Sequence, residues 1–175
     1  KPEMPFPENM LQVTGLCDLY SRTASSVGSD KNKLSLTAIH LDIFSDTVRA
    51  VSCDGSRMAL LKRQAETGGK MSVNIPKAAF YHLACAVKNE DVLDVGIDGK
   101  FLVFMKEGLL FSTRMIDEAF LDVDTLLKHH DEAFKAVAEV EELQRAIDSI
   151  HSIATGDGCS ALKMMFHTDS IEFQY

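Results

Sequence analysis

Several aspartates of this chain stand where a catalytic or metal-binding carboxylate could stand. Asp54 precedes a glycine directly after a strand-like run, a position suited to either role. A simpler interpretation is an Asx turn, in which the aspartate side chain accepts hydrogen bonds from nearby backbone. The other aspartates have no histidine or glutamate at a fixed offset, as a nuclease-like metal set would need: Asp42, Asp46, Asp91, Asp94 and Asp98. We expect these to be solvated carboxylates, which makes a metal-dependent nuclease the less favoured alternative.

Histidine and cysteine offer no better metal site. The run His129-His130-Asp131 falls in an extended connection, where adjacent side chains point apart, whereas a tetrahedral site needs three or four convergent ligands. No P-loop, H-E-x-x-H or G-x-S-x-G motif is present. The four cysteines are widely spaced, with no C-x-x-C pair, so we expect reduced thiols and a cytoplasmic location: Cys17, Cys53, Cys85 and Cys159. The sequence therefore predicts a protein without catalysis, metal or other cofactor.

Composition indicates a globular protein that does not attract nucleic acid as a whole. The chain has 175 residues, of which 46% are hydrophobic and 25% charged, with a net charge of -8. This field repels phosphate, so any contact with DNA needs a local basic surface. No apolar run approaches the roughly 18 residues that a membrane span requires, and we expect no membrane partner.

The hydrophobic pattern that must position these residues is a repeated unit of one strand, one helix and three strands. The first unit begins near Met10 and ends at Thr67-Gly68-Gly69. After a short opening strand, helical and alternating spacings predict a helix over 13–27 and strands over 39–43, 48–52 and 57–63.

The second unit has the same order of elements. Its spacings predict a strand over 71–75, a helix over 76–87 and strands over 92–97, 101–105 and 109–116. Units that recur after roughly 50 to 60 residues pair into one domain. The predicted fold class is α+β, with repeated βαβββ units and helices on one face of antiparallel sheets.

A third unit begins after an acidic connection and is incomplete. Its patterns predict an opening strand over 134–138, a helix over 141–154 and strands over 161–166 and 171–175. Prolines at 2, 5 and 7 are typical of an interdomain linker. Because the first residue is Lys1 and not a methionine, we expect the chain to begin inside a longer protein. The expected organisation is a linker over 1–9, a middle domain over 10–118, a connection over 119–133 and part of a third domain over 134–175.

Four short motifs resemble the bacterial sliding clamp, the β subunit of DNA polymerase III. The run Val51-Ser52-Cys53-Asp54-Gly55-Ser56-Arg57-Met58-Ala59 is similar to the family signature A-T-D-G-H-R-L-A. In family order and at family spacing, the chain also contains Leu36-Thr37-Ala38 for L-x-G, 73–77 for V-x-V-P-(R/K) and 111–117 for F-x-S-(R/K)-L-(I/V)-(D/E). The resemblance covers roughly residues 8 to 175. It departs at Cys53, Ser56 and Met58, and in Phe120-Leu121-Asp122-Val123, which lacks the proline and tyrosine of F-P-D-Y.

The resemblance implies a DNA-clamp fold and a role without chemistry. Family members form a homodimeric ring of six similar domains that encircles duplex DNA, slides on it without reading sequence and tethers the replicative polymerase. Short peptide motifs of the polymerase and of the clamp loader bind such rings. This chain, as a fragment, is expected not to close the ring. An accessory or prophage clamp-like interaction module that does not encircle DNA is the alternative.

The resemblance also implies where a partner peptide binds. Family pocket positions form an apolar hole for leucine or phenylalanine anchors, and they correspond to Leu36, Cys53, Gly55, Ser56, Arg57, Met58, Leu121, Thr125 and Leu126. Without the resemblance, the same residues are explained by strand-end packing and a tight turn at Asp54-Gly55.

Basic side chains on the first two helices and the following loop are the candidates for facing DNA. The second helix has no acidic residue between Pro76 and Lys88, whereas the third carries more acids than bases. A phosphate track and an ordinary solvated face both explain the five candidates, which are Arg22, Lys31, Lys33, Lys77 and Lys88.

Overall fold

The structure is a computed structural model that describes residues 6–128, 135–154 and 162–174, with the backbone alone for 151–154. It divides into two compact units, Lys1–Asp122 and Val123–Tyr175. From here on, "first unit" and "second unit" mean these two parts of the chain, and the sequence repeats are called βαβββ units.

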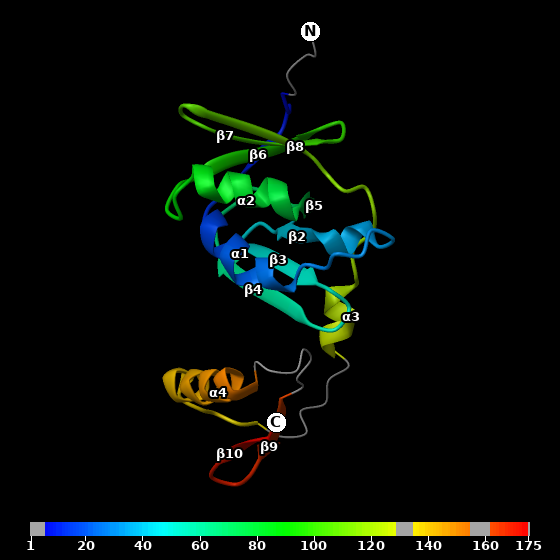
Figure 1. Ribbon diagram of the computed structural model, residues 1–175. Coiled ribbons are helices and arrows are strands. Elements are labelled where there is room, and N and C mark those ends of the chain that lie inside the picture. Colours follow the sequence, from blue (N-terminus) through cyan, green and yellow to red (C-terminus); the bar gives the residue numbers. More distant parts are fainter. Residues whose placement is uncertain (1–5, 129–134, 155–161, 175) are drawn as a thin grey trace. The chain divides into compact units, whose positions relative to one another are not determined.

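Two four-stranded antiparallel sheets form the first unit (Figure 1). The first sheet has the order β1-β6-β7-β8, with strands Met10–Val13, Leu93–Asp98, Phe101–Lys106 and Leu109–Arg114. The second has the order β4-β3-β2-β5, with strands Met58–Gln64, Thr47–Cys53, Ala38–Ile43 and Met71–Pro76. The predicted α+β class with antiparallel sheets is confirmed.

Each sheet contains the opening strand of the other βαβββ unit. β1 precedes the first helix but pairs with β6, with Met10 opposite Gly96. β5 precedes the second helix but pairs with β2, with Ala38 opposite Pro76. The two sheets therefore share one plan, and the exchanged strands join the two halves. The hydrophobic pattern predicts the repeat but not this exchange.

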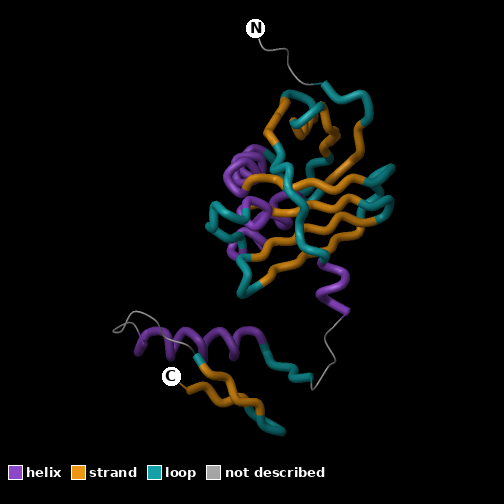
Figure 2. The backbone as a smooth tube through the Cα atoms, turned by 90° about the vertical axis from the view of Figure 1, so that its right-hand side faces the viewer, coloured by secondary structure: helices purple, strands orange, loops and turns teal. Residues whose placement is uncertain are grey.

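Helices α1 (Leu16–Thr23) and α2 (Lys77–Ala86) pack against each other on one side of the strands (Figure 2). The rings of Tyr20 and Phe80 meet edge to face, with centroids 5.7 Å apart. Leu19 and Leu83 are fully buried and join strand residues from both sheets in one hydrophobic core. Burial of these apolar faces is the main force that holds the helices on the sheets.

The first helix is shorter than the spacing predicts. Val13 is the last residue of β1, and Gly15 takes φ 76, a left-handed conformation that only glycine adopts without strain. The α-helix ends at Thr23 and continues as the 3₁₀ turn η1 (Ala24–Ser26), which is followed after a loop by η2 (Leu34–Thr37). The apolar spacing over 13–27 is thus divided among three elements.

The N-terminal lead-in packs on the first sheet. The backbone N–H of Phe6 donates to Asp98 Oδ2 at 3.0 Å, and Pro7 is buried against Gly96. A Cβ at Gly96 would lie 2.5 Å from Pro7 Cβ and 2.7 Å from the Asn9 carbonyl oxygen. Glycine at this position therefore lets the lead-in approach the sheet.

The second unit contains α3 (Val123–Lys128), α4 (Val140–Ala154) and the antiparallel hairpin of β9 (Lys163–Phe166) and β10 (Ile171–Gln174). The prediction of α4 and of both strands is confirmed, whereas α3 replaces the first part of the predicted extended connection. The described part of the predicted opening strand, 135–138, is not a strand. In the first unit, each opening strand pairs with a strand of the other βαβββ unit. In the described part of the second unit, β9 and β10 pair only with each other. None of the described helices is long and apolar enough to cross a membrane.

Candidate functional site

The loop after β3 is a tight turn built around Asp54. Its Oδ1 accepts hydrogen bonds from the backbone N–H groups of Ser56 and Arg57 at 2.9 and 3.0 Å. Its Oδ2 accepts from Arg57 Nε at 2.7 Å. These hydrogen bonds, first that from Ser56, lower the pKa of Asp54 to about 2. The predicted Asx turn is confirmed, and the carboxylate is fully engaged in shaping the loop.

Leu36, in η2, lies next to this loop. The backbone N–H of Gly28 donates to the Leu36 carbonyl oxygen at 2.8 Å. A Cβ on Gly28 would lie 3.2 Å from that oxygen and 3.3 Å from Asp54 Cα, so η2 and the loop both lie against Gly28. The fold therefore brings together six of the residues proposed for the peptide site: Leu36, Cys53, Gly55, Ser56, Arg57 and Met58.

These six residues combine buried apolar side chains with exposed ones. Leu36 and Cys53 are buried, whereas Met58 is 36% exposed and the Arg57 side chain is 68% exposed. Leu121 is exposed near the end of the first unit, and Thr125 and Leu126 are exposed on α3 in the second unit. An apolar side chain beside a fixed guanidinium suits a peptide with a hydrophobic anchor.

The five basic candidates for DNA contact are all exposed. Arg22 lies in the last turn of α1. Lys77 is the first residue of α2, which packs beside α1, and Lys88 follows the end of α2. Lys31 and Lys33 lie in the loop between η1 and η2. Within the described ranges none of the five makes an ion pair, whereas Arg49, Arg57, Arg63 and Lys106 do. None of the five is therefore paired with a carboxylate at ion-pair distance, although the charge of Lys88 contributes to lowering the pKa of Asp91.

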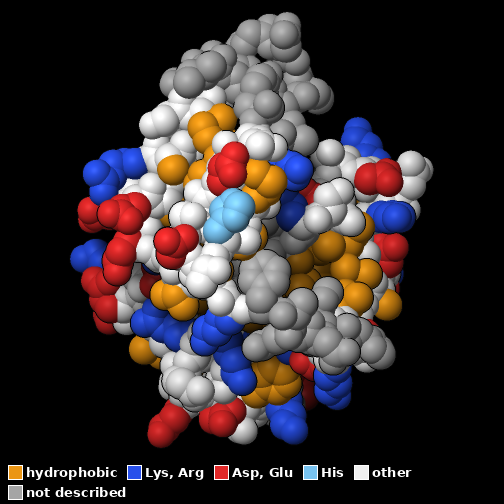
Figure 3. All heavy atoms as spheres, turned by 90° about the horizontal axis from the view of Figure 1, so that it is seen from below, with side chains coloured by type: hydrophobic (Ala, Val, Ile, Leu, Met, Phe, Trp, Pro, Cys, Tyr) orange, Lys and Arg blue, Asp and Glu red, His pale blue; other side chains and the backbone are white. Residues whose placement is uncertain are grey.

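Figure 3 shows one face of the molecule with acidic and basic side chains intermixed and hydrophobic side chains exposed among them. In the part of the chain that the structure describes, no three histidine, cysteine, aspartate or glutamate side chains converge as a metal site would require. The run 129–131 and Cys159 lie outside the described residues.

A buried polar cluster on β2, β3 and β5 is the main feature that sequence reasoning missed. The expectation of a solvated carboxylate is wrong for Asp42, which is 7% exposed, and for Asp91, which is half-buried and pairs with Lys106. Arg49 donates to its Oδ2 through Nη2 at 2.7 Å and Nε at 3.0 Å, and Ser72 Oγ donates to its Oδ1 at 2.9 Å. His40 Nε2 lies 3.1 Å from the same Oδ1. Burial alone raises the pKa of Asp42, but the hydrogen bonds from His40 and Arg49 outweigh burial and lower it to about 2.

The signal for this cluster is present in the sequence as polar residues two apart on neighbouring strands. His40 pairs with Asn74 and Asp42 with Ser72 across β2 and β5, so all four side chains lie on one face. Their proximity depends on the pairing of β2 with β5, which belongs to the unpredicted strand exchange.

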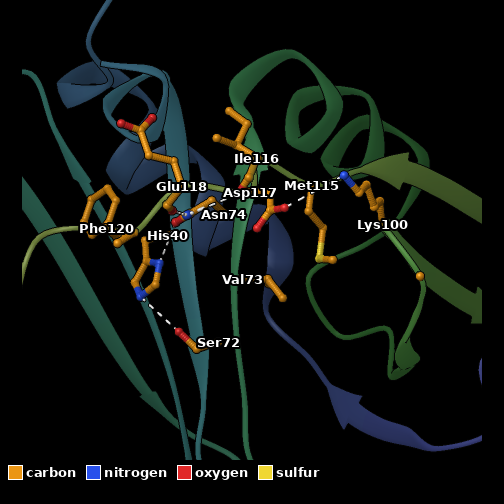
Figure 4. Close-up of a pocket in the computed structure, with 12 residues that line it drawn as sticks. His40, Ser72, Val73, Asn74, Lys100, Met115, Ile116, Asp117, Glu118 and Phe120 are labelled. Atoms are coloured by element: carbon orange, nitrogen blue, oxygen red, sulfur yellow. Dashed lines mark hydrogen bonds and ion pairs between the residues drawn. The ribbon is translucent and has the colours of Figure 1, made fainter. Parts of the chain in front are cut away.

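The segment that follows β8, Met115–Phe120, lies beside this cluster and borders a cavity of about 710 Å³ (Figure 4). We call this segment the strap. Val73 and Met115 contribute apolar surface to the cavity, and Ser72, Asn74 and Lys100 contribute polar groups. The Phe120 ring stacks on His40 with parallel planes and centroids 4.6 Å apart.

Comparison with known proteins identifies the family. The family described as DNA polymerase III beta subunit, central domain, matches residues 10–122. This chain belongs to that family. The match contains both βαβββ units, the loop after β3 and the strap, so the resemblance carried by the four sequence motifs is confirmed.

Individual relatives agree with this family. The beta sliding clamp of Lactococcus lactis is 21% identical over 165 residues, which cover 92% of this chain and 43% of that protein. The sliding clamp structure from Bacillus subtilis has a TM-score of 0.84 and 21% identity, covering 98% of this chain and 47% of the other. The beta subunit structure from Streptococcus pyogenes has a TM-score of 0.80 and 18% identity, covering 99% and 48%. The predicted DNA-clamp fold is confirmed, and the chain spans less than half the length of these relatives.

Proposed function

We propose that this chain acts as part of a sliding clamp that keeps a replicative DNA polymerase on duplex DNA. The observation that carries the proposal is the family match over both βαβββ units, together with the position of Leu36 and the loop after β3 against the same glycine, Gly28. In this role residues 10–118 form the middle domain and 134–175 belong to a third. The work is mechanical, so the proposal requires no catalytic residue, metal or other cofactor, and it places the protein in the cytoplasm.

In the proposed ring, the two helices of each domain face DNA and the sheets form the rim. Arg22, Lys77 and Lys88 supply unpaired positive charge on or beside α1 and α2. Such charges attract phosphates without reading bases, which permits sliding. A homodimeric ring uses more chain than the 175 residues here, and we expect these residues alone not to close one.

Partners, in this proposal the polymerase and the clamp loader, bind through short peptides with hydrophobic anchors. Leu36 and Cys53 provide the apolar base, Met58 offers exposed apolar surface, and Arg57 is fixed at the rim by Asp54. The family resemblance adds Leu121, Thr125 and Leu126 as further candidates for peptide binding.

Binding of a labelled peptide with adjacent leucine and phenylalanine tests this site. Replacing both Arg57 and Met58 by alanine should weaken binding by at least about tenfold, because truncating central anchors of an interface typically costs more than 1 kcal/mol each. Fluorescence anisotropy with the 175-residue chain measures the affinity.

The matched control is Leu60→Ala, an exposed apolar residue two positions further along β4. Its affinity should equal that of the unmodified chain. Equal affinity for the Arg57 and Met58 double variant would reject the site, and circular dichroism of each variant verifies that the fold is retained.

A further inference from the structure

The strap is fastened to the first unit at successive positions. The backbone N–H groups of Met115 and Ile116 donate to the carbonyl oxygens of Lys100 and Asn74, each at 3.0 Å. Asn74 Nδ2 donates to the Glu118 carbonyl oxygen at 2.6 Å. The strap therefore has a defined path over β5 as far as Phe120, whose ring stacks on His40.

The groups that hold the strap are themselves fixed. Asn74 is buried, and its Oδ1 lies 2.7 Å from His40 Nδ1. The other ring nitrogen of His40 faces Asp42, which Arg49 holds through two hydrogen bonds. This network sets the plane of the imidazole on which Phe120 stacks. Figure 4 shows His40 with Asn74 and Phe120. A fully paired buried network of this kind is rigid.

Two residues of the strap, Glu118 and Phe120, lie next to residues of the proposed peptide site, in space or in sequence. Glu118 Oε2 accepts a hydrogen bond from the backbone N–H of Ser35 at 2.7 Å, and Ser35 directly precedes Leu36. Phe120 directly precedes Leu121. A single carboxylate on the strap thus links η2, which carries Leu36, to the segment that carries Leu121.

We propose that Glu118, with Phe120, positions the peptide site by holding η2 and the start of the connection in one arrangement. This inference rests on the proposed function, since it assigns positioning residues to the same site. Glu118 does not need to touch the peptide. It fixes the backbone on which Leu36 and Leu121 stand, and so lowers the ordering cost of binding.

Three substitutions on the strap test the proposal with the same labelled peptide. Glu118→Ala removes the acceptor for Ser35 and should weaken binding about fivefold, a usual size for residues that act through another. Glu118→Gln keeps an oxygen acceptor and should stay within about twofold of the unmodified chain. Asp117→Ala should have no effect, because that side chain is 89% exposed and makes only a 4.0 Å pair with Lys100.

Hydrogen exchange of the Ser35 amide gives a readout that does not require the peptide. Exchange should accelerate in Glu118→Ala, and Glu118→Gln should restore slow exchange.

If Glu118→Ala binds the peptide normally while the Arg57 and Met58 double variant does not, the positioning role is wrong and the proposed site stands. Equal losses in Glu118→Ala and Glu118→Gln would also overturn it, since the hydrogen bond to Ser35 would not be the cause. Normal binding by the double variant rejects the site and the positioning role together.

Discussion

Two aspartates have the same low pKa for different physical reasons. Asp54 is half-buried in a surface turn and is stabilised by the backbone of that turn and by Arg57, whereas Asp42 is buried beside His40, Arg49 and Ser72. Solvent weakens the contribution of the first more than that of the second, whose side chain is only 10% exposed. Asp42 is therefore the carboxylate whose titration should affect the stability of the fold.

Replacing Asp42 by asparagine should destabilise the protein by about 2 kcal/mol near neutral pH. This is the free energy of folding that corresponds to lowering the pKa of Asp42 to about 2. A folded pKa below the unfolded one gives stability that is full above about pH 4 to 5 and is lost as pH falls toward 2. The difference between the two proteins should accordingly shrink in that range. Urea unfolding at a series of pH values measures it.

The control for this experiment is Asp94→Asn, which changes an exposed carboxylate on β6. Its unfolding free energy should follow that of the unmodified protein at every pH. A difference for Asp42→Asn that stays constant down to pH 2 would mean that ionisation of Asp42 does not contribute.

The contrast between these aspartates shows what the sequence could and could not predict at a site. The Asp54 turn depends on residues at adjacent positions, Asp-Gly-Ser-Arg, and was therefore predictable. Asp42 meets Ser72 only through the pairing of β2 with β5. The position of Leu36 beside the loop depends in the same way on tertiary contact, and the family resemblance supplied what local patterns lacked.

At the scale of elements, helical and alternating spacings predicted the order of strands and helices because burial imposes those periods. Boundaries followed from individual residues, such as Gly15 at the start of α1. The short α3 was missed, since Val123–Lys128 is too brief to show a period. The contact of Pro7 with Gly96 could not be predicted from local sequence either, because Gly96 does not interrupt the alternating pattern of β6.

Gly96→Ala should destabilise the first unit by roughly 1–3 kcal/mol, a usual cost of overpacking. The added Cβ would meet Pro7 and the Asn9 backbone, neither of which can rotate away. Gly69→Ala is the matched control, because its Cβ would meet only the terminal methyl groups and Cγ of Leu11, which are mobile. Thermal and urea unfolding compare the two, and an equal response would show that the lead-in is not packed on β6.

At the scale of the whole molecule, the net charge of -8 opposes the local positive charge of α1 and α2. Binding of these residues to linear duplex DNA should therefore be weak and should fall steeply with salt. Reversing Arg22, Lys77 and Lys88 to glutamate should reduce the slope of log affinity against log salt by about 2 to 3, since each phosphate contact contributes about 0.9.

A control with the same change of charge is the reversal of Lys62, Lys70 and Arg114, which are exposed on or next to the sheets. Fluorescence anisotropy at several salt concentrations compares the two triple variants. Equal slopes would indicate that general charge, and not the helix surface, determines the contact with DNA.

The exchanged opening strands have a consequence for synthesis on the ribosome. The sheet β4-β3-β2-β5 comes from one contiguous stretch, Ala38–Pro76, and can assemble as soon as that stretch has emerged. β1 emerges first but cannot pair until β6 appears, because Val13 lies opposite Leu93, 80 residues later. At about 5–20 residues per second this is a delay of roughly 4 to 16 s. During that time the nascent chain carries an unpaired strand, and it is then that chaperones or neighbouring nascent chains have access to it.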